Sequence, residues 1–106
     1  MREITVEELK AKMEDGSEFH LLDVREPAEY QEYNMGGKLF PLGNIVSMQV
    51  EDLEDWKSDE VVIHCRAGSR SMQACMVLEQ LGFTNVVNVK GGALAWQEKY
   101  GDQKVK

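Results

Sequence analysis

The sequence has few of the residues that cross-link small folds or bind metals. Its 106 residues include only two cysteines and two histidines. A small secreted domain held by disulfides would contain more cysteines, so we expect Cys65 and Cys75 to be free thiols in a reducing compartment. The methionines are scattered, which is typical of residues that fill gaps in a core rather than bind metal.

Long hydrophobic runs are also absent. No apolar stretch approaches the length of a membrane-spanning helix. The first residues, Met1–Glu8, lack the apolar segment of a secretory signal peptide. We therefore expect the protein to be cytoplasmic.

Positive charge is in the minority. The chain has 12 lysines and arginines against 19 aspartates and glutamates, a formal net charge of −7. Because such a chain repels phosphate backbones and anionic lipids, neither nucleic acid nor a membrane is an expected partner. An anionic substrate would need local positive potential, and the sequence offers this around residues 65–70.

Short apolar segments alternate along the chain with segments of helical spacing. Thr5 and Glu8 match a capping box, which predicts a helix that ends near Asp15. Pro27 suits the first turn of a second helix. Strands are predicted at residues 19–24, 61–64 and 85–89, with a short or edge strand at 38–42. Further helices are predicted at residues 50–56, at 72–81 and after Gly92.

This alternation predicts an α/β fold with a small, mostly parallel sheet. The connections are short and no repeat or linker appears, so we expect one domain over residues 1–106. Residues 101–106 have little to bury, and we expect this tail to fray.

The chemically most informative segment is His64–Ser71, between the clearest strand and a helix. Ligands of parallel sheets bind at this end of the strands. A helix N-terminus offers unpaired N–H groups and partial positive charge. Gly68 can adopt a positive φ, which lets the loop curl into a cradle of donors, and Arg66 and Arg70 add charge. We therefore expect Cys65 to be largely a thiolate at neutral pH.

A thiolate in an anion-binding loop can attack phosphorus or a sulfane sulfur. Cysteine phosphatases and arsenate reductases are the first alternative, and the phosphatase signature places five residues between cysteine and arginine. Here four residues separate Cys65 from Arg70. The shorter loop favours one sulfur atom over a phosphoryl group, and no aspartate is clearly placed as a general acid.

The same loop resembles the active site of rhodanese-like domains, Cys-x-x-Gly-x-Arg followed by Ser or Thr. The resemblance continues through the Asp-Val-Arg-Glu segment at Leu22–Tyr30, then Leu81–Val86 and Gly91–Trp96, and covers roughly residues 3–100. The stretch Tyr33–Lys38 departs from the Gly-His-Ile-Pro-Gly-Ala sequence that the family often shows there.

The resemblance implies a rhodanese-like fold with helices on both faces of the sheet. It also implies a sulfurtransferase in which Cys65 takes a sulfane sulfur from thiosulfate or a persulfide donor. The Cys65 persulfide would then pass the sulfur to cyanide or a thiol, with no metal or organic cofactor. The implied substrate-binding residues are Arg66, Ala67, Gly68, Ser69, Arg70 and Ser71.

The expected partners are a small sulfur donor such as thiosulfate and a small-thiol or protein acceptor. We expect the chain to be a monomer or a weak homodimer. A sulfur-relay protein and a non-catalytic interaction module are the alternatives, although the presence of Cys65 favours activity.

Three residues outside the loop are expected to have structural roles. Asp23 and Arg25 end a strand on the ligand side, and we expect them to form an ion pair or hydrogen bonds that support the site. Cys75 lies too far along the helix for direct exchange with Cys65, and we expect it to be a core residue.

Overall fold

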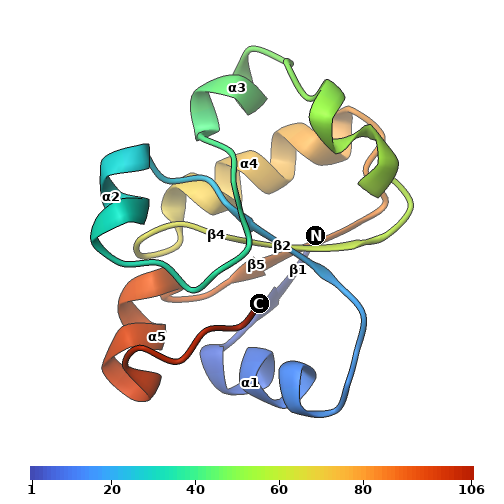
Figure 1. Cartoon of the computed structure of the whole chain (residues 1–106). Helices are drawn as coiled ribbons and strands as arrows, with labels where there is room; N and C mark the ends of the chain where they lie inside the picture. Colours follow the sequence, from blue (N-terminus) through green and yellow to red (C-terminus); the bar gives the residue numbers. More distant parts are fainter.

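The computed structural model describes residues 1–106 and contains a five-stranded sheet with helices on both faces (Figure 1). The strand order is β1-β5-β4-β2-β3, and every neighbouring pair is parallel. The strands are β1 (Arg2–Ile4), β2 (His20–Asp23), β3 (Lys38–Leu39), β4 (Glu60–His64) and β5 (Asn85–Val89). The predicted α/β class and parallel sheet are confirmed.

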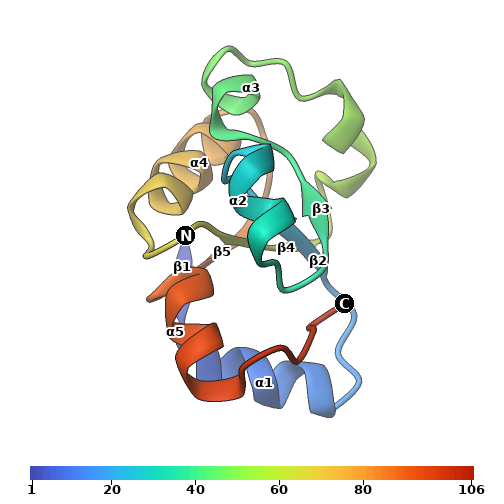
Figure 2. The same ribbon diagram turned by 60° about the vertical axis from the view of Figure 1, so that its left-hand side comes forward.

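Helices fill the connections between the strands. They are α1 (Val6–Glu14), α2 (Pro27–Glu32), α3 (Leu42–Val46), the 3-10 helix η1 (Glu51–Trp56), α4 (Ser69–Gln80) and α5 (Gly92–Tyr100). Thr5 and Glu8 form the predicted capping box, in which each side chain accepts a hydrogen bond from the other residue's backbone N–H. In both views the starts of α4 and α5 lie with α2 at one end of the sheet (Figures 1 and 2).

Each face of the sheet carries its own hydrophobic cluster. Successive residues of a strand point to opposite faces, so Ile63 joins the cluster under α3, η1 and α4, whereas Val62 joins the cluster under α1 and α5. Val86 and Val87 divide between the two clusters in the same way. Strands buried on both faces account for the nearly continuous apolar runs of β4 and β5.

The sequence did not reveal two elements, β1 and α3. Strand β1 is short and lies at the edge of the sheet, where it pairs only with β5. Helix α3 has only five residues and buries only Ile45 completely. Elements of this length carry too few residues for a hydrophobic period to be visible.

The tail that was expected to fray, residues 101–106, contacts the rest of the domain at Val105 and Gln103. The backbone N–H of Val105 donates to the carbonyl of Met35 at 2.8 Å, and the Val105 residue is buried in the cluster under α1 and α5. The indole of Trp96 donates to the carbonyl of Gln103 at 2.7 Å. The tail therefore packs against the loop before β3, part of the Tyr33–Lys38 stretch that departs from the family pattern.

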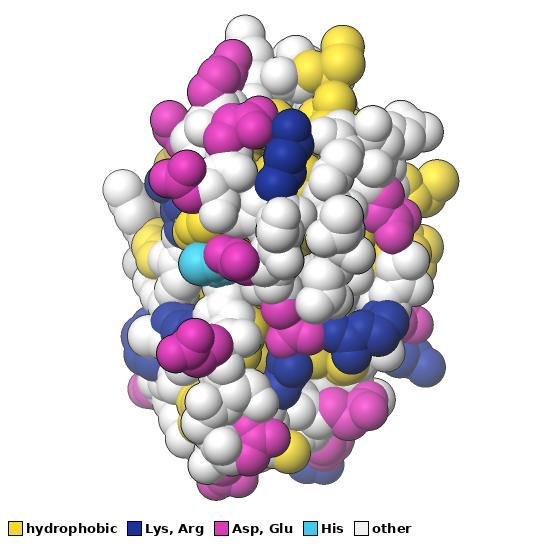
Figure 3. All heavy atoms as spheres, turned by 90° about the vertical axis from the view of Figure 1, so that its right-hand side faces the viewer, with side chains coloured by type: hydrophobic (Ala, Val, Ile, Leu, Met, Phe, Trp, Pro, Cys, Tyr) yellow, Lys and Arg dark blue, Asp and Glu magenta, His cyan; other side chains and the backbone are white.

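Acidic and basic side chains are interspersed over the face shown in Figure 3. Surface ion pairs such as Lys10 with Glu14 join oppositely charged neighbours, although exposed pairs of this kind add little stability. None of the helices combines the length and the apolar character needed to cross a membrane.

Candidate active site

The loop between β4 and α4 surrounds the sulfur of Cys65. Strand β4 ends at His64 and α4 begins at Ser69, so the cysteine lies at the carboxyl end of a central strand, just before a helix N-terminus. Gly68 caps the helix with a φ of 121°, a value that L side chains rarely adopt. This conformation lets the Gly68 N–H turn back toward the cysteine.

Backbone and side-chain donors converge on the Cys65 sulfur. The Gly68 N–H lies 3.1 Å from Sγ and the Ser71 hydroxyl 3.4 Å from it. Burial raises the pKa of this thiol, but the Ser71 hydroxyl and the N–H groups of Ser71, Gly68 and Ala67 together lower it below the ordinary value. Cys65 itself exposes only about 1% of its surface. The sulfur is thus shielded from solvent yet faced by hydrogen-bond donors.

The start of α5 holds the other side of the loop. The Ala93 N–H donates to the carbonyl of Cys65 at 2.8 Å, and the Leu94 N–H donates to the carbonyl of Arg66 at 2.9 Å. Gly92 makes this approach possible, because a Cβ there would lie 2.4 Å from the Cys65 carbonyl oxygen. These two bonds hold the loop backbone in the conformation in which its N–H groups face the sulfur. This long-range contact is not visible in the local sequence pattern.

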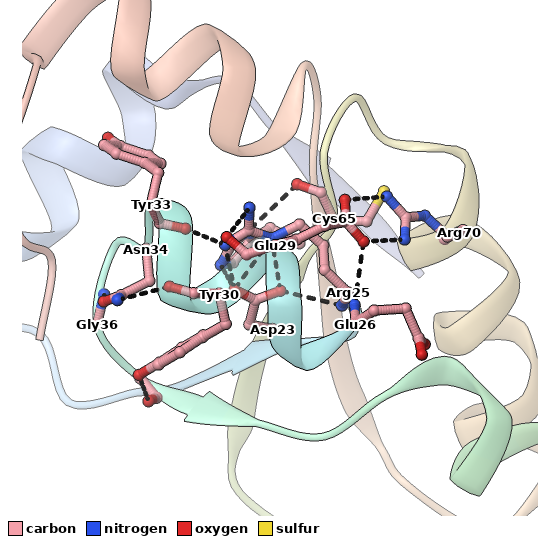
Figure 4. Close-up of polar contacts among 12 residues, drawn as sticks. Asp23, Arg25, Glu26, Glu29, Tyr30, Tyr33, Asn34, Gly36, Cys65 and Arg70 are labelled. Atoms are coloured by element: carbon pink, nitrogen blue, oxygen red, sulfur yellow. Dashed lines mark hydrogen bonds and ion pairs between the residues drawn. The ribbon is translucent and has the colours of Figure 1, made fainter.

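Arg70 is not a free cation. Its guanidinium makes two parallel bonds to the Glu29 carboxylate, at 2.8 and 2.9 Å, and lies beside Cys65 (Figure 4). The Arg70 hydrogen bonds lower the pKa of Glu29 to about 2 despite partial burial. Glu29 also accepts a hydrogen bond from the Glu26 N–H at 3.0 Å. Its bonds to Arg70 tie α2 to α4. Sequence reasoning missed Glu29, although it lies within the segment that resembles the family.

The predicted ion pair of Asp23 and Arg25 is present. Both residues are buried, and the Arg25 guanidinium meets the carboxylate at 2.7 Å and donates to the Tyr33 carbonyl at 2.7 Å (Figure 4). Arg25 also lines a recess of about 160 Å³ that Arg66 borders from the loop between β4 and α4. The pair joins the end of β2 to the end of α2, and Arg25 forms part of one wall of that recess.

The remaining loop residues divide into two groups. Ala67 and Ser69 are exposed, and the Ser69 side chain makes no capping bond. Ser71 is fully buried and lies within reach of Asn88, a residue of β5 that sequence reasoning also missed. The signal for Asn88 was a polar residue in the otherwise apolar strand segment Val86–Val89.

Cys75 and His64 lie behind the site. Burial raises the pKa of Cys75 to about 12, and this thiol belongs to the hydrophobic cluster under α4, as expected of a core residue. His64 is fully buried, with Nδ1 3.2 Å from the carbonyl oxygen of Cys65. Burial also lowers the pKa of His64.

This arrangement is suited to hold a sulfur anion at one position. Hydrogen bonds to an ionised sulfur favour the thiolate, which is the nucleophilic form of cysteine. The same N–H groups can stabilise negative charge on an atom attached to Sγ. The chemistry that fits is nucleophilic attack by Cys65 with formation of a covalent adduct.

Comparison with known proteins finds similarity to rhodanese-like and sulfurtransferase proteins. Residues 5–99 match the family model of the rhodanese-like domain. The putative sulfurtransferase YtwF of Bacillus subtilis is 37% identical over 97 residues, which cover 92% of this chain and 91% of that protein. The thiosulfate sulfurtransferase PspE of Escherichia coli is 36% identical over 73 residues, 68% of this chain and 69% of PspE. A rhodanese-like domain protein from Staphylococcus aureus has a similar structure, with a TM-score of 0.81, 31% identity and coverage of 98% and 99% of the two chains.

Proposed function

Because this chain belongs to the rhodanese-like domain family and is a sulfurtransferase, we propose that it carries a sulfane sulfur on Cys65 as a persulfide. The Cys65 thiolate attacks the outer sulfur of thiosulfate, a new S–S bond forms, and sulfite leaves with the electron pair of the broken bond. A thiol or cyanide then attacks the outer sulfur of the persulfide, and Cys65 departs as the thiolate.

The observation that carries this proposal is the set of donors around Sγ. The Gly68 N–H and the Ser71 hydroxyl face the sulfur at 3.1 and 3.4 Å. They stabilise the thiolate as nucleophile in the first step and as leaving group in the second. Because Cys65 is so little exposed, a donor with a small reactive end is favoured.

We place the remaining part of the substrate in the recess beside the loop. Arg66 is exposed at its edge, and no carboxylate pairs with its guanidinium. Arg70 is already paired with Glu29. We therefore assign the first contact with the sulfonate of thiosulfate, or with the carboxylate of an acceptor thiol, to Arg66. Sulfur relay to a partner protein would use the same persulfide.

Mass spectrometry of the protein after incubation with thiosulfate tests the proposal. We expect the mass to rise by one sulfur atom and to return to its initial value after addition of cyanide. The Cys65→Ser variant is expected to show no gain. The Cys75→Ser variant is the matched control and is expected to take up sulfur like the parent chain.

Three results would count against this function. One is no mass gain in a fully reduced sample, and another is a gain that survives in Cys65→Ser. The third is hydrolysis of a phosphate ester faster than formation of thiocyanate, which would favour a phosphatase. A stable persulfide with weak turnover on cyanide and small thiols would point to a protein as the acceptor.

A further inference from the structure

A row of hydrogen-bonded polar side chains connects the buried Cys65 to Glu3 on the edge strand β1, where Glu3 is exposed. The Ser71 hydroxyl reaches Cys65 Sγ at 3.4 Å and makes a short contact with Asn88 Oδ1. The Asn88 side-chain N–H donates to the Glu3 carboxylate at 3.0 Å. Ser71 and Asn88 are both fully buried. The bonds of Asn88 join residues far apart in the sequence, and Glu3 lies opposite Asn88 on the neighbouring strand β1.

The direction of the Asn88 amide is fixed by Glu3. A carboxylate only accepts hydrogen bonds, so the amide nitrogen must face Glu3 and the amide oxygen must face Ser71. The reversed amide would place two acceptors against each other at the Glu3 carboxylate. Asn88 therefore offers Ser71 an acceptor, not a donor.

The Ser71 hydroxyl then has more acceptors than protons. Its single proton can reach Cys65 Sγ, Asn88 Oδ1 or the Gly68 carbonyl, which lies at 3.1 Å. When Cys65 is a thiol or a persulfide, its inner sulfur is a poor acceptor, and the Ser71 hydroxyl donates its hydrogen bond to the Asn88 oxygen. When Cys65 is a thiolate, the ionised sulfur is the stronger acceptor.

We propose that Asn88, oriented by Glu3, is a positioning residue that competes with the Cys65 sulfur for the hydrogen bond donated by Ser71. This inference rests on the proposed function. The hydroxyl points to Asn88 in the persulfide and turns to Sγ as the thiolate departs. This alternative partner keeps a buried hydroxyl satisfied in every state. It also limits how far the thiol is acidified, because each thiolate leaves the Asn88 oxygen without the Ser71 proton.

Other charged groups also face the cysteine. Arg70 lies beside it but is held by Glu29, and Arg66 lies on the loop itself. Cys75 is the other titratable group of the same cluster. None of these groups touches Ser71 or Asn88 through a hydrogen bond, so a change at Asn88 leaves their contacts in place. The effect of Asn88 can thus be separated from theirs.

A double-mutant cycle on the pKa of Cys65 tests the proposal, with the pH dependence of iodoacetamide alkylation as readout. Asn88→Leu removes the competing acceptor, so the pKa of Cys65 is expected to fall, with roughly a three- to tenfold rise in thiolate fraction below the midpoint. Ser71→Ala is expected to raise this pKa. In the Ser71→Ala background, Asn88→Leu is expected to change nothing further.

An Asn88 effect that persists without the Ser71 hydroxyl, or a rise in pKa for Asn88→Leu, would overturn the proposal. If Asn88→Leu does not fold, Asn88→Val serves as the second variant. It also removes the competing acceptor without adding charge, so the pKa of Cys65 is expected to fall; a rise or no change would be contrary. Asn85→Leu, on the same strand but without contact to Ser71, is the matched control. Alkylation does not require sulfur transfer, so failure here leaves the persulfide proposal standing.

Discussion

Cys65 and Cys75 belong to the same hydrophobic cluster, and both are almost inaccessible to solvent, yet their acidities move in opposite directions. Burial raises the pKa of Cys75 to about 12. Burial also acts against ionisation of Cys65, but the Ser71 hydroxyl and the N–H groups of the loop outweigh it and lower the pKa. Hydrogen-bond donors, rather than exposure, therefore lower the pKa of one of two buried thiols.

The Ser71 hydroxyl and the backbone N–H groups of the loop together produce this difference, and α5 holds that backbone in place. The N–H of Ala93 donates to the Cys65 carbonyl at 2.8 Å. This bond holds the loop in the conformation in which its N–H groups face Sγ. Cys75 lies inside α4, where backbone N–H groups bond to carbonyls of the preceding turn. A thiol within a helix therefore finds no such donors.

The largest expected effect comes from closing the gap between α5 and the loop. Gly92→Ala would place a methyl group 2.4 Å from the Cys65 carbonyl oxygen, at a φ of 55° that already disfavours a side chain. We expect the alkylation rate of Cys65 to fall roughly a hundredfold, since small displacements of reacting groups are costly. Steady alkylation kinetics at neutral pH measure this.

Gly43→Ala is the control for that substitution. Gly43 lies in α3, and a Cβ there meets nothing within 4 Å. Its Cys65 reactivity is expected to match the parent chain. Equal reactivity of the Gly92→Ala variant would show that α5 does not hold the loop.

Removing the side-chain donor should have an intermediate effect. Ser71→Ala takes away the hydroxyl that lies 3.4 Å from Sγ and leaves the loop backbone intact. We expect the pKa of Cys65 to rise and the alkylation rate at neutral pH to fall about tenfold, as for loss of a hydrogen bond to a charged group. Ser69→Ala, at an exposed position without a capping bond, is the control and should titrate like the parent. A pKa unchanged by Ser71→Ala would attribute the whole effect to the backbone.

Some of this site is visible in the sequence and some is not. Cys65, Gly68 and Arg70 lie within six residues of one another, in a loop that precedes a helix. This local pattern is enough to predict a loop of donors around the cysteine. The partners that complete the site come from other elements: Glu29 on α2 bonds Arg70, and Asn88 on β5 bonds Ser71. Hydrophobic periodicity contains no information about such long-range polar pairs.

The fold shows the same division. The capping box at Thr5 and the β-branched strand β4 are properties of short segments, and both were predicted. The contacts of the tail cannot be seen in its own sequence, because Val105 bonds to the distant residue Met35. Residues 101–106 contain few apolar side chains of their own. The surface against which they pack exists only once the rest of the chain has folded.

A smaller effect is expected from the core cysteine. Cys75→Ala removes a buried sulfur from the cluster under α4, and we expect it to lower the free energy of unfolding by about 1 kcal/mol through the cavity it leaves. The alkylation rate of Cys65 should stay at the parent value. Urea unfolding and alkylation of the same sample measure both. Slower alkylation of Cys65 would mean that the two thiols are coupled.

The smallest effect concerns acid stability. The pKa of Glu29 is lowered from 4.5 to about 2, so its bond to Arg70 contributes stability that is complete above pH 4.5 and is lost as pH falls through about 2. Glu29→Gln removes this contribution. We expect the urea midpoints of parent and variant to differ most at neutral pH and to converge near pH 2. A constant difference over that range would contradict the ion pair.

The most direct test is to follow alkylation of both cysteines in the native protein across pH, with peptide mapping to separate them. We predict that Cys65 reacts with a midpoint below the ordinary thiol value of about 8.5, while Cys75 reacts only when urea unfolds the chain. A Cys65 midpoint at or above that value, or equal reactivity of the two thiols, would contradict the role assigned to the donors around Cys65.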